Sequence, residues 1–477
     1  MEERKGFGSN FGFIMAAVGS AVGLGNIWGF PNKMGASGGA LFLIIYLVLA
    51  VFCGFIIMLG ELALGRKTGQ GAVGAYKVLS KKFGWMGWLG IASAFFILFF
   101  YCALGGYCIK YVVLNVGDLF GAGFGSNGLT GGEVFGAFMG SPVESIIYGL
   151  IFVAITMVIV MGGIGGGIEK VCSIGMPCLF VALIICIIRA LTLPGAVDGL
   201  KYMFVPGWAV ANGVIAEAPS FFNVLSTAGG QMFFSLSLGM GAMITYGSYL
   251  DKKENLEKNA VMIVVLDTLV ALMAGLCVIP ARFALDPEGA LGGPSLLFVT
   301  MQNVFQKMGS VGPIFGILFY LLVVFAAISS SISLLEVITT HFVDQAREAG
   351  KGDKRKKYCV TAAALVGLGC ILVCADCLGG NNIAPWQLLG LESYAGWNDC
   401  WLDFWDMLSE GIMMPLGALL MSLMIGWEIG PEVVKGECEA TPGHKMGSFG
   451  FFKICIKVIT PLIMLFILYG QIKSFFG

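Results

Sequence analysis

The chain has 477 residues, of which 57% are hydrophobic and only 12% are charged, and its formal net charge is -1. Soluble globular domains carry about 25% charged residues, so this composition argues against a soluble enzyme and predicts a protein embedded in a lipid bilayer. The balanced charge and the lack of a basic patch with aromatic residues argue against nucleic-acid binding.

Apolar stretches recur along the whole chain. Each is long enough to cross about 30 Å of hydrocarbon, which takes about 20 helical residues. The sequence therefore predicts an all-α polytopic membrane protein with eleven transmembrane helices. The predicted spans lie near 11–32, 40–64, 86–116, 144–162, 169–192, 217–248, 260–284, 309–343, 358–376, 400–427 and 449–474.

Positive charge is distributed unevenly between the loops. Lys and Arg residues precede the first predicted span and fill the loops after the second, sixth and eighth, whereas the stretches 117–143 and 377–399 contain neither. Cytoplasmic loops of membrane proteins carry the excess of Lys and Arg. We therefore expect the N-terminus in the cytoplasm and, after eleven crossings, the short C-terminus outside the cell membrane.

The residues that carry enzyme chemistry are sparse. The two histidines, His341 and His444, fall near the expected cytoplasmic ends of helices, and most of the fourteen cysteines lie inside apolar spans. Cys374 and Cys377 have redox spacing without a βαβ context, and Cys377 and Cys400 flank one outer loop, where a disulfide is left open. No nucleophile–base pair or metal cluster is visible, so we expect a protein that is not an enzyme.

The first span is interrupted by the stretch GSAVGLGNIWGFPNKMG (19–35). A helix break in lipid leaves N–H and C=O groups unpaired, each at a cost of several kcal/mol, unless protein, water or a ligand satisfies them. Close helix packing by small residues explains Gly19 and Gly23 but not Asn26 and Pro31. The sequence therefore predicts a discontinuous first helix that lines a cavity.

A second interruption, FFSLSLGMGAMITYGSY (233–249), lies within the sixth span. Paired broken helices at corresponding positions of two halves indicate the binding site of a secondary transporter. Half-helix N-termini attract a carboxylate, and freed carbonyl groups attract a small cation such as Na⁺. We expect a 5+5 inverted repeat with discontinuous helices 1 and 6, divided into 1–192 (helices 1–5), 193–430 (helices 6–10) and 431–477 (helix 11).

Four motifs together carry a family resemblance: GSAVGLGN…FP in the first span, GELALGR (60–66), the interrupted sixth span, and FAAISSSISLLE (325–336). With these motifs the chain resembles the bacterial amino-acid branch of the neurotransmitter:sodium symporter family, over essentially its whole length. The resemblance implies a LeuT-type fold and a symporter that imports an amino acid with sodium by alternating access. A channel would need a continuous polar stripe, which the spans lack.

The resemblance implies two sodium sites. In the second site, adjacent serine hydroxyls would face the broken first helix; their alternative role is hydrogen bonding to carbonyl groups of their own helix. The first site would use Ala21, Asn26, Ser235 and Asp267 with the substrate carboxylate, and the second Gly19, Val22, Ala326, Ser329 and Ser330.

Asp267 departs from many relatives, which have Asn at this position and Ser or Glu one turn later, where this chain has Ala271. A carboxylate inside the membrane is costly and usually functional. We expect Asp267 to supply the negative charge that chloride supplies in animal relatives, so that transport is chloride-independent. Tyr46, Gln231 and Ser235 are the retained residues of that site.

The resemblance also places a substrate pocket. Monoamine carriers have Asp at the position of Gly23, so a glycine favours a substrate that brings its own carboxylate, which Tyr101 would bind. The apolar lining favours a hydrophobic or aromatic amino acid; the alternative is another zwitterion, or a partly cationic amino acid or amine. The predicted pocket residues are Ser20, Ala21, Gly23, Gly25, Ile97, Tyr101, Leu104, Phe234, Ser235, Ser237, Met240, Ser331 and Leu334.

The extracellular gate departs from the family pattern. Gly29 stands where relatives usually have an arginine that pairs with an acid in span ten, and that acid is present as Asp406. Asp406 could be solvated, could pair with Lys33, or could contact a cationic part of the substrate. Tyr101 and Phe234 are still expected to close over the site.

On the cytoplasmic side, the resemblance implies an inner gate formed by Arg4 and Asp344. Gly167 and Pro177 frame a nine-residue interval in span five that is associated with local unwinding in relatives. Among the buried acids, Glu61 is expected to cap backbone at the helix breaks, and Glu336 is left without an assigned role, with proton coupling an open alternative.

Overall fold

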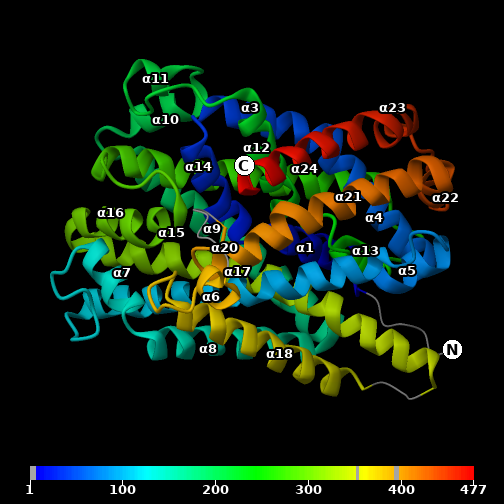
Figure 1. Cartoon of the computed structure of the whole chain (residues 1–477), viewed down its shortest axis with the longest axis horizontal. Helices are drawn as coiled ribbons and strands as arrows, with labels where there is room; N and C mark the ends of the chain where they lie inside the picture. Colours follow the sequence, from blue (N-terminus) through cyan, green and yellow to red (C-terminus); the bar gives the residue numbers. More distant parts are fainter. Residues whose placement is uncertain (1–6, 351–353, 391–396, 477) are drawn as a thin grey trace.

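The computed structural model describes residues 7–350, 354–390 and 397–476. Within these residues every regular element is a helix, and the long helices run side by side along the longest axis of the molecule (Figure 1). Arg4, which the sequence assigns to the inner gate, lies outside the described residues.

The first five predicted spans are present as helices, and span one is broken. In the second span and at the start of the fifth, π-helical turns adjoin the α-helices. The spans comprise α1 (Asn10–Ala21), η1 (Gly25–Gly29) and α2 (Phe30–Ala36); α3 (Ala40–Leu49), η2 (Ala50–Gly54) and α4 (Phe55–Thr68); α6 (Met86–Phe120); α8 (Pro142–Met161); and η3 (Ile164–Glu169) with α9 (Lys170–Leu191).

The remaining six predicted spans are also helical, and span six is broken. They comprise α12 (Phe221–Ser235) and α13 (Ala242–Gly247); α14 (Leu256–Leu285); α17 (Gly312–Glu348); α18 (Arg355–Asp376); α20 (Trp401–Asp406), η6 (Met407–Met413), α21 (Met414–Leu423) and η7 (Met424–Glu428); and α23 (Phe449–Ile454), η8 (Cys455–Ile459) and α24 (Thr460–Phe476).

Short helices connect the spans. One end of the molecule holds α5 and α22, whereas α7 and α16 lie at the opposite end (Figure 1). The connecting helices are α5 (Ala72–Leu79), α7 (Gly131–Met139), α10 (Ala196–Phe204), α11 (Trp208–Ala211), α15 (Gly293–Ser295), η4 (Leu296–Thr300), α16 (Met301–Lys307), η5 (Gly309–Val311), α19 (Pro385–Leu389) and α22 (Glu432–Glu439).

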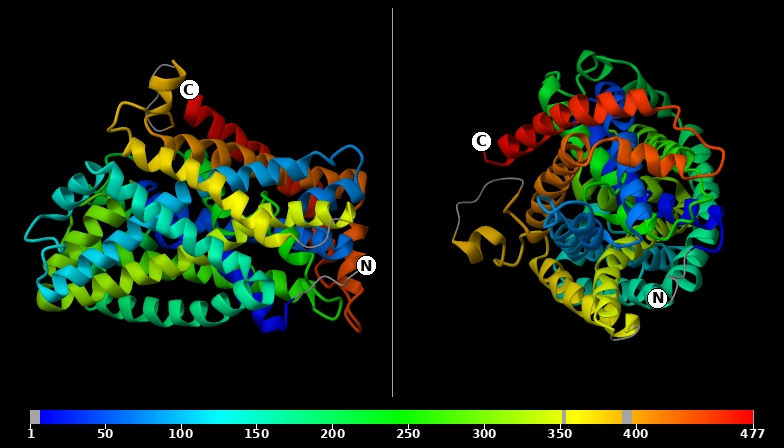
Figure 2. Two further views of the ribbon diagram at one scale, coloured as in Figure 1. Left: turned by 90° about the horizontal axis from the view of Figure 1, so that it is seen from below. Right: turned by 90° about the vertical axis from the view of Figure 1, so that its right-hand side faces the viewer.

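Nine helices of the described chain are long and apolar enough to cross a bilayer, and the bent pair formed by span one makes ten. The two halves of span one meet at an angle of 46°. Span six is also broken, with six residues between α12 and α13, and adding it to these ten gives the eleven predicted crossings. Viewed along the long axis, the helices form a closed bundle (Figure 2).

Burial explains why such an apolar chain is stable as a bundle. Large side chains such as Tyr46, Phe100 and Tyr320 are fully buried between helices, whereas Val265 and Ile184 are about half exposed. Exposed apolar side chains on transmembrane helices meet lipid tails, which solvate them as well as a protein core does. The polar side chains are instead gathered inside the bundle, around the breaks in spans one and six.

Candidate functional site

The break in span one covers residues 22–24, between α1 and η1. Val22 has an extended backbone (φ -72°, ψ 102°), which ends the helix. The N–H of Gly23 donates to Asn26 Oδ1 at 3.0 Å, and the N–H of Leu24 donates to the hydroxyl of Tyr101 at 2.9 Å. Side chains therefore satisfy the backbone groups that the break leaves unpaired, as a low-dielectric setting requires.

The break in span six covers residues 236–241. Gly239 (φ +82°) adopts a left-handed backbone in which its Cα lies against the backbone of Met414, a conformation and an approach that favour glycine. Its N–H donates to Glu61 Oε1 at 2.7 Å, and Ser237 Oγ donates to the carbonyl oxygen of Ser20 at 2.8 Å. Glu61 thus caps the break as expected, and Ser237 joins the two breaks directly.

Three of the residues predicted for the first sodium site meet beside these breaks. The amide nitrogen of Asn26 donates to Ser235 Oγ at 2.9 Å, to Asp267 Oδ1 at 2.8 Å and to the carbonyl oxygen of Asp267 at 3.1 Å. The hydroxyl oxygen of Ser235 and two oxygen atoms of Asp267 therefore converge on the amide nitrogen of Asn26. A hard cation requires an oxygen-rich donor set, which these atoms would supply if the Asn26 amide turned its oxygen toward them. Ala21, the fourth predicted residue, is the last residue of α1.

The residues predicted for the second sodium site also lie together. Ser329 Oγ is 3.2 Å from the carbonyl oxygen of Val22 and 2.9 Å from that of Ala326, and Ser330 Oγ is 3.3 Å from that of Gly19. Ser329 thus bonds both within its own helix and across to span one. Serine hydroxyls and carbonyl groups from α1 and α17 form a second cluster of oxygen atoms.

The other carboxylate oxygen of Asp267 faces away from Asn26. It accepts a hydrogen bond from Ser235 Oγ at 2.9 Å and lies 3.5 Å from the hydroxyl of Tyr46. Gln231 does not join this group: its amide donates to the carbonyl oxygen of Gly25 at 2.6 Å, and its Oε1 has no hydrogen-bond partner within the described chain. Asp267 is completely buried.

A small cavity lies where the two breaks face α6 and α17. Its volume is about 10 Å³, close to the space of one water molecule, so its walls must separate to admit an organic substrate. Tyr101 and Phe234 lie over it with ring centroids 6.3 Å apart in an edge-to-face arrangement. The lining residues are Ala21, Gly23, Gly25, Ile97, Tyr101, Phe234, Ser237, Met240, Ser330 and Leu334.

The remaining predicted pocket residues surround this cavity without lining it. Ser20 Oγ donates to Ser333 Oγ at 2.7 Å, and Ser331 Oγ lies 2.8 Å from Thr156 Oγ1. Leu104 is buried. The sequence pattern did not identify Thr156, because a single hydroxyl in an apolar helix has no distinctive spacing, and it did not separate Ser333 from the neighbouring serines of span eight.

The ion pair on the predicted extracellular side differs from the family pattern at both partners. Lys33 pairs with Glu410, and their side chains are 23% and 5% exposed. Asp406 is half-buried and forms no hydrogen bond within the described part of the chain. Glu410 was missed in the sequence, although it follows Asp406 by one helical turn, as Lys33 follows Gly29.

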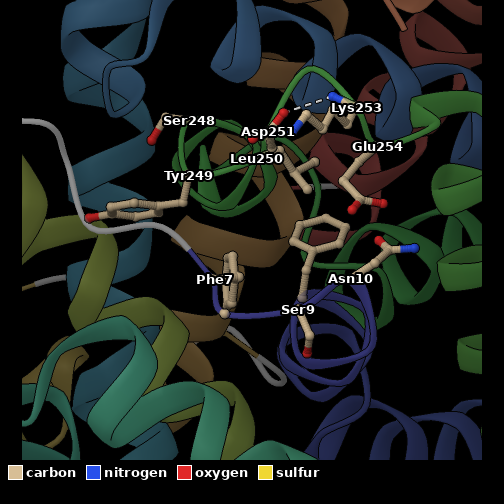
Figure 3. Close-up of a pocket in the computed structure, with 11 residues that line it drawn as sticks. Phe7, Ser9, Asn10, Ser248, Tyr249, Leu250, Asp251, Lys253 and Glu254 are labelled. Atoms are coloured by element: carbon tan, nitrogen blue, oxygen red, sulfur yellow. Dashed lines mark hydrogen bonds between the residues drawn. The ribbon is translucent and has the colours of Figure 1, made fainter. Parts of the chain in front are cut away.

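At the opposite end, Asp344 accepts a hydrogen bond from the N–H of Gly71 at 3.1 Å. Phe7 packs edge-to-face against Phe13, Tyr246 and Tyr249. Phe7 and Tyr249 line a cavity of about 500 Å³ between the N-terminal segment and the loop after α13 (Figure 3). These rings close the end of span one toward the predicted cytoplasmic side.

Glu336, which the sequence left without a role, is fully buried. It pairs with Arg355, whose Nη1 is 3.1 Å from Glu336 Oε1, and it accepts hydrogen bonds from Tyr249 at 3.0 Å and Thr340 at 2.8 Å. Arg355 also donates to the carbonyl oxygen of Val160. The acid therefore joins α17, α18, the end of α8 and the loop after α13.

Pro177 lies inside the continuous helix α9, and Gly167 lies in the π-helical turn η3. Span five is therefore wound in this structure, with its irregular backbone confined to the residues before Lys170. Unwinding is expected between Gly167 and Pro177, but the chain is helical there in this structure.

The disulfide left open between Cys377 and Cys400 is not formed; both thiols are free and buried. Burial raises the pKa of the Cys377 thiol, which favours its protonated form. Cys374 is likewise free. Within the described residues no cluster of three His, Cys, Asp or Glu side chains could hold a metal ion.

Comparisons with known proteins agree with this geometry. The model of the sodium:neurotransmitter symporter family matches residues 4–119 and 138–476. An uncharacterized sodium-dependent transporter of Bacillus subtilis, YhdH, is 33% identical over 468 residues, which are 96% of each chain. One of Methanocaldococcus jannaschii is 30% identical over 476 residues, which cover 97% of this chain and 89% of the relative.

A solved structure has the same fold. The crystal structure of MhsT in complex with L-phenylalanine superposes with a TM-score of 0.84 at 34% sequence identity, and the match covers 98% of this chain and all of that one. The family is one of transporters and not of enzymes. This chain is a multi-pass membrane protein with a LeuT-type fold and belongs to the sodium:neurotransmitter symporter family.

Proposed function

We propose that this sodium-dependent transporter imports an amino acid with a hydrophobic or aromatic side chain, together with sodium ions at two sites. The observation that carries the proposal is the close approach of two hydroxyl groups, from Ser330 and Tyr101, to Gly23. A Cβ atom at Gly23 would lie 3.0 Å from Ser330 Cβ and closer still to Ser330 Oγ and the Tyr101 hydroxyl. Only a residue without a side chain lets both hydroxyls reach the break, where they would meet the carboxylate of a substrate once the cavity walls separate.

The polar groups around that point suit an amino-acid backbone. The Tyr101 hydroxyl accepts from the N–H of Leu24 and can donate its own proton to a carboxylate. The carboxylate would complete the oxygen set formed by Ala21, Asn26, Ser235 and Asp267. Sodium and substrate then share ligands, so each raises the affinity of the other by the same factor.

The side-chain end of the cavity is apolar, since Ile97, Met240 and Leu334 line it. The complex of MhsT with L-phenylalanine supports a substrate of this class. Met is an adaptable side chain that can adjust to ligands of different size. These contacts support a hydrophobic or aromatic substrate as a class.

Chloride independence is part of the proposal. Asp267 Oδ2 lies against Ser235 and Tyr46, so a carboxylate already places a negative charge next to the proposed first sodium site. A chloride ion at the same place would meet that charge at close range in a low dielectric, which is unfavourable.

Gating and orientation complete the proposal. We place the N-terminus in the cytoplasm, the C-terminus outside, and the two repeats at 1–192 and 193–430 with helix 11 at 431–477. Tyr101 and Phe234 would close the outer side of the site. The ion pair of Lys33 with Glu410 would replace the ion pair that relatives form between an arginine, at the position of Gly29, and an acid, at the position of Asp406. Arg4 and Asp344 would close the inner side.

Uptake into proteoliposomes tests the function. Purified transporter, with an inward sodium gradient and a panel of all twenty amino acids, GABA, creatine and dopamine, should accumulate one or more hydrophobic or aromatic amino acids. Uptake should persist when gluconate replaces chloride and should stop when potassium replaces sodium. Accumulation of an amine alone, or a chloride requirement, would contradict the corresponding part of the proposal.

A further inference from the structure

Glu169, the last residue of η3, contacts the start of span one. Its Oε2 accepts a hydrogen bond from the N–H of Gly8 at 2.8 Å, and its Oε1 accepts one from Ser9 Oγ at 3.3 Å. Ser9 is also the N-cap of α1, where its Oγ accepts from the N–H of Gly12 at 2.9 Å. A carboxylate at this place pairs with otherwise free donors and with the positive end of the helix dipole.

The side chain of Glu169 also packs on α1 itself. A Cβ atom at Gly12 would overlap the carboxylate of Glu169 and would lie 2.6 Å from its Cγ. Any side chain at position 12 would therefore displace Glu169. The contact thus depends on one charged residue and one glycine from segments far apart in the sequence.

Glu169 is attached to an irregular stretch of backbone. It ends the π-helical turn Ile164–Glu169, which follows Gly163 with a left-handed φ of +79°. Gly165 and Gly166 in this turn are exposed. Glycine-rich and π-helical backbone is less stable than α-helix and changes conformation readily, so η3 can move relative to α9.

We propose that Glu169 is a positioning residue that keeps the start of span one docked on span five. When η3 rearranges, the carboxylate moves away from Gly8 and Ser9, so the N-terminal segment is released in the same event. The inference rests on the proposed alternating-access function, for which it supplies a coupling between these two segments.

Other contacts of the N-terminal segment are independent of Glu169. Asn10 accepts a hydrogen bond from Asn259 on α14 at 3.1 Å, and the ring of Phe7 packs against Tyr246 and Tyr249. Figure 3 shows Phe7, Ser9 and Asn10 facing one cavity together with the loop after α13. A variant at Glu169 should loosen the docking while these contacts keep the fold.

Native Cys172 reports on this docking. It is 1% exposed, and a Cβ atom at Gly19 would lie 3.1 Å from its Sγ, so the thiol lies between α1 and α9. Separation of span one from span five would expose it. Cys108 is also fully buried, on α6, and serves as the internal control for general loosening.

The experiment measures alkylation of Cys172 by N-ethylmaleimide, read by peptide mass spectrometry on the purified full-length transporter. Glu169→Gln and Gly12→Ala should each raise the rate about tenfold, because local opening governs the reactivity of a buried thiol. Glu169→Asp should restore part of the protection. The matched control is Asp198→Asn, which removes an exposed acid that pairs with Lys201 and should leave the rate unchanged.

Two results would overturn the inference: an unchanged Cys172 rate in both Glu169→Gln and Gly12→Ala, or an equal rise at Cys172 and Cys108, which marks loss of fold. The measurement needs neither substrate nor a sodium gradient. Failure of uptake would therefore contradict the proposed function, whereas failure of selective labelling would contradict the role of Glu169.

Discussion

At the scale of single residues, we expect Gly23 to decide which substrates the cavity can take. Gly23→Ala places a methyl group against Ser330 and Tyr101, where it would occupy the proposed carboxylate position. Equilibrium binding of the best amino acid of the uptake panel should weaken by about 100-fold, equivalent to about 3 kcal/mol.

The control for this variant is Gly436→Ala. Gly436 lies in α22 with open space around it, so the substitution should leave binding unchanged and should slightly stabilise the helix. Equal binding by Gly23→Ala and the wild type would show that the carboxylate is held elsewhere.

Asp267 is expected to supply a negative charge beside the first sodium site. Asp267→Asn keeps an oxygen atom near Asn26 and Ser235 but removes the negative charge. Uptake in gluconate should fall by about tenfold or more, since a lost charge in a buried site costs at least about 1.4 kcal/mol, and chloride should restore part of it. Asp198→Asn should behave as the wild type in both anions, and a variant indifferent to chloride would refute the assigned role.

At the scale of elements, a side chain from a neighbouring helix accepts a hydrogen bond from the backbone at each helix break. Glu61 on α4 holds the break in span six, Tyr101 on α6 holds the break in span one, and Ser237 connects the two breaks. Carboxylates and hydroxyls are costly in lipid, and here they replace the lost backbone partners. The breaks are therefore fixed parts of the fold and not places where the helices have frayed.

The ion pair between Lys33 and Glu410 joins span one to span ten. Single charge reversals, Lys33→Glu and Glu410→Lys, should slow uptake and lower thermal stability, since each leaves a buried charge opposed by a like charge. The double reversal should recover part of both, with a coupling free energy of about 1 kcal/mol.

A second double-mutant cycle pairs Lys33 with Asp406 in place of Glu410. Because Asp406 interacts electrostatically with Lys33 but forms no hydrogen bond within the described residues, Lys33→Glu with Asp406→Lys should show a smaller recovery than the Glu410 cycle. Recovery only in the Asp406 cycle would mean that the family's usual acid is the functional partner.

The sequence predicted the two breaks because glycine, asparagine and proline are out of place in a membrane helix. It also predicted the two oxygen clusters, because Asn26 and the adjacent serines of span eight match motifs of the family that the chain resembles. It did not predict Glu410 or the partners of Glu336, because a charge pair between distant helices depends on how the side chains pack. The π-helical turns, such as η6, have no sequence signal of their own.

At the scale of the whole molecule, two ion pairs lie in separate layers of the bundle. Lys33 with Glu410 lies at one end of span one, and Glu336 with Arg355 lies near the end of the bundle that holds the loop after α13. The central cavity lies between these layers, and its volume of about 10 Å³ leaves no room for an organic substrate in this arrangement. The proposed alternating access requires each layer to separate in turn while the other stays closed.

The central claim is that the two helix breaks hold a sodium ion and the substrate carboxylate side by side. The most direct test is equilibrium binding of the best amino acid to the purified transporter, with sodium or potassium at equal ionic strength. The account predicts affinity at least about tenfold higher in sodium, and sodium affinity raised by the same factor when the amino acid is present. Equal affinities in sodium and potassium would contradict it.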